Sequence, residues 1–237
     1  MFNKIARVFA MAATVLIAAC GGGGDSAGEN GGPVASTQTF QMRTAYVNSI
    51  SIAGSKNFTV SGTVSGFPVG GSGTLTVSGL SAATFEGVAA QQTSTTLATT
   101  ITSGGSSFPQ TITSLAYVDA NYNPLGGSIA GKEYFVVVPA SGNIPVTAKV
   151  NDTGTAYTAT LYTSSDKLTP MGTRKVSFLL AADTESTALL RLTSVDKNLS
   201  GDIVSTSTSE YRMTPAGDLT HLKDTGMDAI FSLTFTY

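Results

Sequence analysis

The residue best suited to acid–base chemistry is His221, the only histidine among the 237 residues of the chain. It lies in "GDLTHLKD", between Asp218 and Asp224. A catalytic triad requires a carboxylate that holds the histidine and a serine that the histidine holds. The chain has no Gly-x-Ser-x-Gly turn to present that serine. A strand starting near Leu219 places His221 on the same face as Leu219, so we expect a sheet-face histidine without a catalytic role.

The motif "DANYN" alternates Asp119, Asn121 and Asn123, as at the start of a calcium-binding loop. Such a loop continues with glycine at its sixth position and glutamate at its twelfth, where this chain has Pro124 and Ala130. Asp and Asn are also common in β-turns. We therefore expect a turn here and no metal ion.

The sequence offers little else for a cofactor or for hydrolysis. Zinc needs a cluster of cysteine and histidine side chains, and the chain has one of each. No Gly-Lys-Ser/Thr sequence is present to hold a phosphate. Asp183 and Glu185 in "AADTES" are expected to be two solvated acids in a turn. Carboxylates from distant strands can still meet without a sequence signal, so an acid pair stays open. We expect no cofactor and no enzymatic activity.

The only cysteine, Cys20, indicates where the protein resides. Lys4 and Arg7 precede an uncharged run, residues 8–19, which ends directly before Cys20. This run is shorter than the roughly 20 residues of a membrane-spanning helix. A cationic start, a short apolar run and small residues at the cut site are typical of a secretory signal peptide, which we assign to residues 1–19.

The sequence Ile17-Ala18-Ala19-Cys20 resembles the lipobox of bacterial lipoproteins. The resemblance implies a diacylglycerol on the Cys20 sulfur, cleavage before Cys20 and acylation of the new amino group, so the partner is a membrane bound through acyl chains. In lipoproteins of two-membrane bacteria, an Asp after the cysteine favours retention on the inner membrane. Gly21 stands there, which favours the outer membrane.

Residues 20–37 are rich in Gly and Ser, which predicts a lipid-anchored flexible tether. The remaining body resembles the uncharacterised Gly/Thr-rich lipoproteins of proteobacteria that begin "ACGGGG". This resemblance rests on the leader and on composition, so it implies no site residues.

Composition excludes nucleic acid as a partner. The chain has 13 basic and 15 acidic residues, and without Lys4 and Arg7 the basic count falls to 11. Phosphate binding needs clustered Lys and Arg, whereas the only basic doublet is Arg174-Lys175. Hydrophobic residues make up 41% of the chain, enough for a core, although charged residues make up only 12%.

Apolar residues alternate with period two along most of the body, which indicates half-buried strands. Clear examples are "NFTVSGTV", "RKVSFLL", "TALLRLTSV" and the final "DAIFSLTFTY". Turn residues separate these segments at short intervals. The pattern predicts an all-β fold, an antiparallel meander or sandwich of about a dozen short strands. We expect no helix apart from the signal peptide, and we expect the last strand to cover a core.

Charge changes abruptly along the body. Residues 38–118 carry three charges, Arg43, Lys56 and Glu86, and residues 119–237 carry 21. The boundary is rich in Asn, Gly and Pro. We therefore expect a charge-poor β module at 38–118, a connecting segment at 119–131 and a second β module at 132–237.

These features together predict a lipid-anchored protein of the cell envelope that is not an enzyme and presents a surface for binding or structural association. Its protein or polysaccharide partner is not identifiable from sequence. Two alternatives stay open. A periplasmic carrier of an apolar ligand needs a large apolar cavity. A hydrolase of envelope polymers needs a cleft where carboxylates, or His221, converge.

Overall fold

The structure is a computed structural model that describes residues 32–237. The signal peptide, Cys20 and most of the predicted tether lie outside the described residues. Thirteen strands and a helix make up the described part. They are α2 (Met42–Ser51), β1 (Gly54–Val64), β2 (Phe67–Val77), β3 (Ser81–Phe85), β4 (Val88–Ser103), β5 (Ser106–Val118), β6 (Pro124–Ile129), β7 (Glu133–Val137), β8 (Thr153–Tyr162), β9 (Pro170–Ala182), β10 (Ala188–Lys197), β11 (Ile203–Met213), β12 (Leu219–Asp228) and β13 (Phe231–Thr236).

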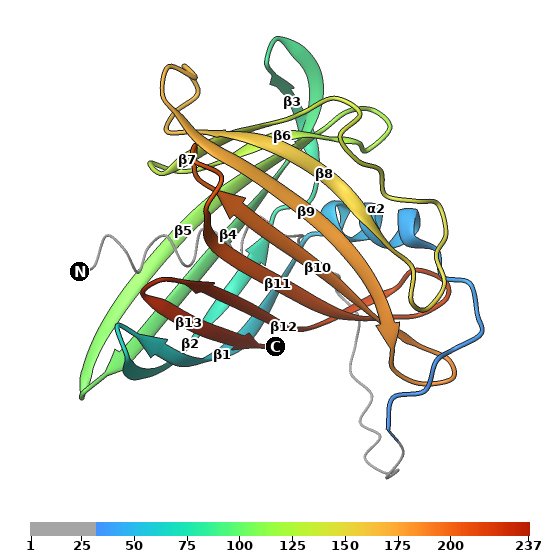
Figure 1. Ribbon diagram of the computed structural model, residues 1–237, viewed down its shortest axis with the longest axis horizontal. Coiled ribbons are helices and arrows are strands. Elements are labelled where there is room, and N and C mark those ends of the chain that lie inside the picture. Colours follow the sequence, from blue (N-terminus) through green and yellow to red (C-terminus); the bar gives the residue numbers. More distant parts are fainter. Residues whose placement is uncertain (1–31) are drawn as a thin grey trace.

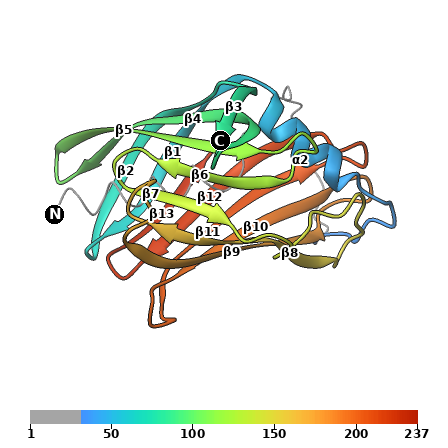
Figure 2. The same ribbon diagram turned by 90° about the horizontal axis from the view of Figure 1, so that it is seen from above.

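The strands form a single antiparallel sheet that closes into a barrel (Figure 1). From β4 to β13 each strand pairs with the next one in sequence, and β13 pairs with β1. The ring closes because β2 pairs with β1 on one side and with β4 on the other. Figure 2 shows the sheet wrapped around an interior, with α2 at one end. The prediction of an all-β antiparallel fold is confirmed.

Period-two alternation decides which side chains enter the barrel. In β13, Phe231, Leu233 and Phe235 are buried while the residues between them are not. In β10, Leu190 and Leu192 are buried on the same face. Such residues from most strands, together with α2, form one continuous core. The last strand therefore covers a core, as predicted.

The helix α2 corrects the expectation that the body contains no helix. Its buried residues, Met42, Ala45, Tyr46, Ser49 and Ile50, recur at helical spacing and face the barrel interior. The segment has no side-chain N-cap and no acidic residue in its first turn, so local sequence favours a helix only weakly. Burial of its apolar face, a tertiary effect, stabilises it. Within residues 32–237, no helix has both the length and the apolar character needed to cross a membrane.

The two expected β modules do not form separate sheets. Strands from 38–118 and from 132–237 join the same ring at β13–β1 and through β5–β6–β7. The expected connecting segment 119–131 contains β6, which pairs with both β5 and β7. A change in the number of charged residues along the chain carries no information about which strands pair.

The β3 strand lies beside the ring and pairs only with β4. Its Phe85 is buried against the rings of Tyr117 and Tyr134, at centroid distances of 4.6 and 5.6 Å. Glycine is required beneath it, because a Cβ at Gly126 would lie 2.3 Å from the Phe85 ring. The neighbouring Gly127 makes the same kind of room for Phe135, whose ring would lie 2.6 Å from a Cβ there.

Candidate functional site

His221, Asp224, Tyr211 and Tyr237 meet inside the barrel, and we call them the histidine cluster. The His221 Nε2 atom lies 2.9 Å from Asp224 Oδ1, and the Tyr237 hydroxyl donates to Asp224 Oδ2 at 2.7 Å. The imidazole stacks on the rings of Tyr211 and Tyr237, at centroid distances of 4.4 and 3.8 Å. His221 and Leu219 are both buried on one face of β12, which confirms the predicted sheet-face position.

A β-bulge in β12 brings His221 and Asp224 together. Residues three apart on a regular strand point to opposite faces of the sheet. Here Tyr211 pairs with His221 while Glu210 pairs with Lys223, so β12 has an extra residue at this point. The bulge turns both side chains to the interior. Alternation in the sequence therefore predicted the face of His221 but gave no sign of its partner.

The histidine cluster is a buried hydrogen-bond network. An imidazole N–H donates and a carboxylate oxygen accepts, so the tautomer with its proton on His221 Nε2 makes the hydrogen bond to Asp224. Burial, and then the charge of Asp224, raises the pKa of the Tyr237 hydroxyl, which stays a donor. His221 Nδ1 is buried and has no hydrogen-bond partner among residues 32–237, so no serine of this part of the chain completes a triad there.

Arg174, Asp196 and Glu133 form a second buried cluster, which we call the arginine triad. Arg174 donates to both oxygens of Asp196 at 2.7 Å, and to the two oxygens of Glu133 at 2.7 and 3.1 Å. Burial opposes the guanidinium charge, but the carboxylates of Glu133 and Asp196 outweigh it and raise the pKa of Arg174 above its usual range. Both carboxylates are therefore committed to one cation.

The strand register explains how the arginine triad assembles. Arg174 and Asp196 are direct cross-strand partners on β9 and β10. On its other side Arg174 faces Ala159 of β8, whose short side chain lets the guanidinium reach Glu133 at the start of β7. The Phe135 ring lies 5.5 Å from the guanidinium carbon, at cation–π distance.

Sequence reasoning missed the arginine triad, although one signal was present. Arg174 precedes Val176 and Phe178 at period two, and Asp196 follows Leu192 in the same way. Alternation thus predicts an inward-facing charge on each strand, and a buried charge needs a partner. The third member, Glu133, has no such signal, because the apolar run that follows it, residues 134–138, does not alternate.

Small hydroxyl side chains extend the polar lining of the barrel wall. Ser205 and Ser207 of β11 and Thr93 and Thr95 of β4 are buried. Their hydroxyls have no hydrogen-bond partner within the described part of the chain. The interior is therefore polar along part of its wall and apolar elsewhere.

The "DANYN" segment, which resembles the start of a calcium-binding loop, is a turn, as predicted. Asp119 Oδ1 accepts from the backbone N–H groups of Asn121 and Asn123 at 2.8 Å each. The Arg43 guanidinium donates to the Asn121 carbonyl and to the Asn123 side-chain oxygen. The oxygens that a cation would need here therefore already accept hydrogen bonds from N–H groups. Among residues 32–237, no group of three or more His, Cys, Asp or Glu side chains is placed to hold a metal ion.

The "AADTES" turn differs from the expectation of two solvated acids. Asp183 accepts from Arg212 Nε at 2.7 Å and from the Thr187 hydroxyl at 2.6 Å, while Glu185 is exposed. Partial burial opposes ionisation of Asp183, but these two hydrogen bonds lower its pKa below the ordinary value. The two acids do not share a site.

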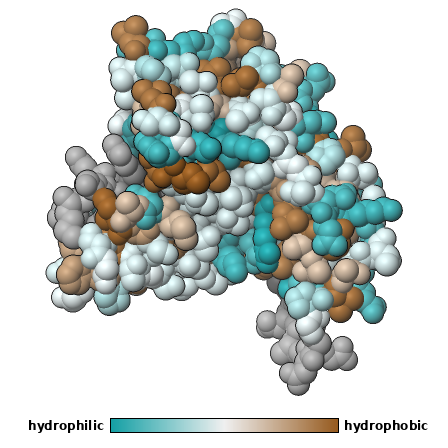
Figure 3. All heavy atoms as spheres, viewed as in Figure 1, coloured by the Kyte–Doolittle hydropathy of each residue, from teal (hydrophilic) through white to brown (hydrophobic). Residues whose placement is uncertain are grey.

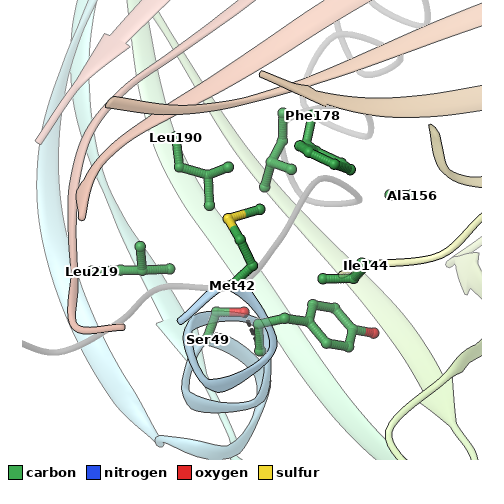
Figure 4. Close-up of a pocket in the computed structure, with 9 residues that line it drawn as sticks. Met42, Ser49, Ile144, Ala156, Phe178, Leu190 and Leu219 are labelled. Atoms are coloured by element: carbon green, nitrogen blue, oxygen red, sulfur yellow. Dashed lines mark hydrogen bonds between the residues drawn. The ribbon is translucent and has the colours of Figure 1, made fainter. Parts of the chain in front are cut away.

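A small cavity, the helix cavity, lies between α2 and the barrel wall (Figure 4). Met42 and Ser49 of α2 face Phe178, Leu190 and Leu219 across it. The Ser49 hydroxyl is satisfied by the Tyr46 carbonyl at 2.6 Å. The volume of the helix cavity is about 20 Å³, which is room for about one water molecule.

The fold and these clusters define the chain as a closed antiparallel β-barrel with a helix packed into its core. Comparison with protein-family models, with curated proteins and with solved structures found no match. Function therefore has to be argued from the sites themselves.

Proposed function

We propose that this protein is a lipid-anchored β-barrel of the cell envelope that acts by binding or structural association, without catalysis. The anchor is Cys20, and the outer membrane is its favoured location. In support, the side chains most capable of chemistry are committed to one another. His221 donates to Asp224, and Arg174 occupies the oxygens of Glu133 and Asp196. A hydrolase of envelope polymers is not proposed, because these buried acids have no free oxygen to act as acid or base.

The observation that carries this proposal is where the N-terminal segment meets the barrel. The Val34 N–H donates to the Asp183 carbonyl at 3.1 Å, and the Ser36 hydroxyl donates to the Glu185 carbonyl at 2.7 Å. Both contacts lie in the β9–β10 connection, at one end of the barrel. A tether that arrives at one end leaves the walls and the opposite end open to a protein or polysaccharide partner.

Substituting Cys20→Ser is expected to release the protein from the membrane. Two or more acyl chains hold a protein stably, whereas serine offers no sulfur to acylate. Detergent phase partitioning measures the effect: the unaltered protein should enter the detergent phase and the variant the aqueous phase. Ser26→Ala in the same segment is the matched control and should partition like the unaltered protein. If the Cys20→Ser variant still enters the detergent phase, another segment holds the protein.

A carrier of an apolar ligand is a second candidate, because apolar side chains dominate the lining of the helix cavity. An acyl chain does not fit in about 20 Å³, so the ligand would have to displace α2. Native mass spectrometry of the purified protein tests this. A bound lipid whose occupancy falls in Ala156→Leu, which fills the cavity, would favour the carrier. A mass equal to that of the protein alone would favour surface binding.

A further inference from the structure

The β3 strand leaves one side of the sheet open. In the part of the chain that the structure describes, every other strand has a neighbour on both sides over at least part of its length, whereas β3 pairs only with β4. Figure 1 shows β3 near the upper edge of the molecule. A free edge presents unpaired N–H and C=O groups, which are a template for another strand.

The turn between β3 and β4 shows which backbone groups are free. Phe85 and Val88 flank the two-residue turn Glu86–Gly87, where φ is 51 and 81°. The residues that flank such a turn exchange backbone hydrogen bonds, and along the two strands they alternate with residues whose groups point away from the partner. Counting back from Phe85, the N–H and C=O groups of Thr84 and Ala82 therefore point to the free edge.

This free edge is open to solvent. Ala82 and Thr84 are both exposed, and within residues 32–237 their backbone groups make no hydrogen bond outside the β3–β4 pairing. The segment from Ser51 to Ala53 lies against Gly79, so the open part of the edge begins after that glycine. We call the outward backbone groups of Ala82 and Thr84 the β3 edge.

A free edge on β5 gives a contrast. β6 pairs with β5 only from Ser114 onward, so on the side away from β4 residues 106–113 have no strand partner in the described part of the chain. Pro109 lies in this stretch, and the same alternation, counted from the two-residue turn 104–105, points its nitrogen to the free side. A proline, which has no N–H, is a common protection of edge strands. Residues 81–84 contain neither a proline nor a charge, so the β3 edge has no such protection.

Contacts at the hairpin tip hold the β3 edge in place. Phe85 packs against the rings of Tyr117 and Tyr134, and Glu86 accepts a hydrogen bond from the Tyr134 hydroxyl at 2.5 Å. Glu86 also forms an ion pair with Lys167. A partner strand therefore meets an edge that is already ordered, which lowers the entropy cost of association.

The free groups define the chemistry of the partner. N–H and C=O groups at every second residue match the main chain of an extended polypeptide, which adds to a sheet edge as a further strand. Neither a lipid nor a polysaccharide presents this alternation of donors and acceptors. Much of the face shown in Figure 3 is pale, that is, neither strongly hydrophilic nor strongly hydrophobic, which favours recognition through the main chain.

We propose that β3 pairs antiparallel with β3 of a second copy of this chain. The free groups lie symmetrically on either side of Ala83. When Ala83 lies opposite the second copy's Ala83, each Ala82 faces a Thr84, and every free N–H meets a free C=O. The contact is then the same on both copies, as a two-fold dimer requires.

The pairing has no electrostatic cost but a small area. Residues 81–84 carry no charge, so no like charges face each other across the pair. A ladder between two strands of 5 residues buries less than the roughly 1,000 Å² of a stable interface, so the dimer is a weak one. The inference goes beyond the proposed function, because strand pairing does not depend on an anchor at Cys20.

Sedimentation equilibrium of the full chain carrying Cys20→Ser tests the pairing without acyl chains. We expect a dimer whose fraction rises with protein concentration. Adding Thr84→Pro removes the free N–H at that position in both copies, and an edge strand accommodates a proline there. The dissociation constant should then rise at least about tenfold. Thr84→Val keeps the N–H and is the matched control, which should dimerise like the parent chain. Circular dichroism checks that each variant folds.

A single cysteine tests the register. With Cys20→Ser the chain has no cysteine, so Ala83→Cys introduces the only thiol. Residues directly opposite each other in a non-hydrogen-bonded pair have Cα atoms about 4.5 Å apart, within reach of a disulfide. Ala82→Cys is the matched control, because the two cysteines would then be diagonal neighbours about 7–8 Å apart. Mild oxidation should therefore cross-link the Ala83→Cys chain much faster than the Ala82→Cys chain.

Three results would overturn the inference: a monomer at every concentration, a dimer that Thr84→Pro leaves unchanged, or equal cross-linking of Ala82→Cys and Ala83→Cys. A monomer that instead binds a synthetic peptide of alternating Thr and Val, with binding lost in Thr84→Pro, would assign the β3 edge to a strand of another protein.

Discussion

Substituting Arg174→Met is expected to lower the free energy of unfolding by about 3–5 kcal/mol. The change removes the cation between Asp196 and Glu133 together with all four hydrogen bonds that it donates. Asp196 then stays buried, and Glu133 half-buried, without a counter-charge, which is among the most costly states in a folded protein. Urea denaturation measures the difference, with Cm as the readout if the slope is unchanged.

Arg191→Met is the matched control for this substitution. Arg191 donates to Glu210 at 2.6 Å, but the Arg191 side chain is 42% exposed and Lys223 also pairs with Glu210, at 3.3 Å, so Glu210 keeps a counter-charge and the loss should be about 0–1 kcal/mol. Replacing the whole arginine triad, with Arg174→Met, Glu133→Leu and Asp196→Leu, should recover much of the stability, because no unpaired charge remains. Equal losses in Arg174→Met and Arg191→Met would show that the triad does not stabilise the barrel.

Substituting Asp224→Ala is expected to cost about 2–4 kcal/mol. His221 Nε2–H and the Tyr237 hydroxyl both lose their acceptor, and His221 is 3% exposed, so water cannot replace it. Burial is the largest cause that raises the pKa of the Tyr237 hydroxyl above its usual range, and it persists in the variant, so this hydroxyl cannot avoid the loss by ionising. Thermal unfolding should show Tm lower by about 5–15 °C.

Two variants separate the hydrogen bonds of the histidine cluster from general effects of losing an acid. Glu185→Ala removes an exposed carboxylate from the β9–β10 turn and should leave Tm nearly unchanged. Asp224→Asn keeps an oxygen acceptor and should fall between the alanine variant and the unaltered protein. A Tm for Asp224→Ala equal to that of Glu185→Ala would contradict the assigned role of the cluster.

Alternation explains why the inward faces of many strands were predictable. In β13 and β9 the apolar residues Phe231, Leu233, Val176 and Phe178 recur at every second position, and each is buried. A pleated strand allows only this periodicity. The helix α2 was not predictable in the same way. Its five buried residues have helical spacing, but one of them is Ser49 and no capping side chain marks the start of the helix, so the sequence signal is weak and burial against the barrel decides the helix.

The anchor at Cys20 is predicted from the order of residues in the chain, a short apolar run followed by a cysteine. Cys20 lies outside the described residues, so the structure does not test this prediction. The all-β class and the inward position of His221 likewise follow from neighbours in the chain, because strand periodicity is local. Closure of β2 onto β4, the bulge that turns Asp224 toward His221, and the meeting of Glu133 with Arg174 were decided by the tertiary structure. The bulge depends on the register of β12 against β11, and the other two contacts join strands that are not consecutive in the chain, so none of the three follows from the periodicity of a single strand.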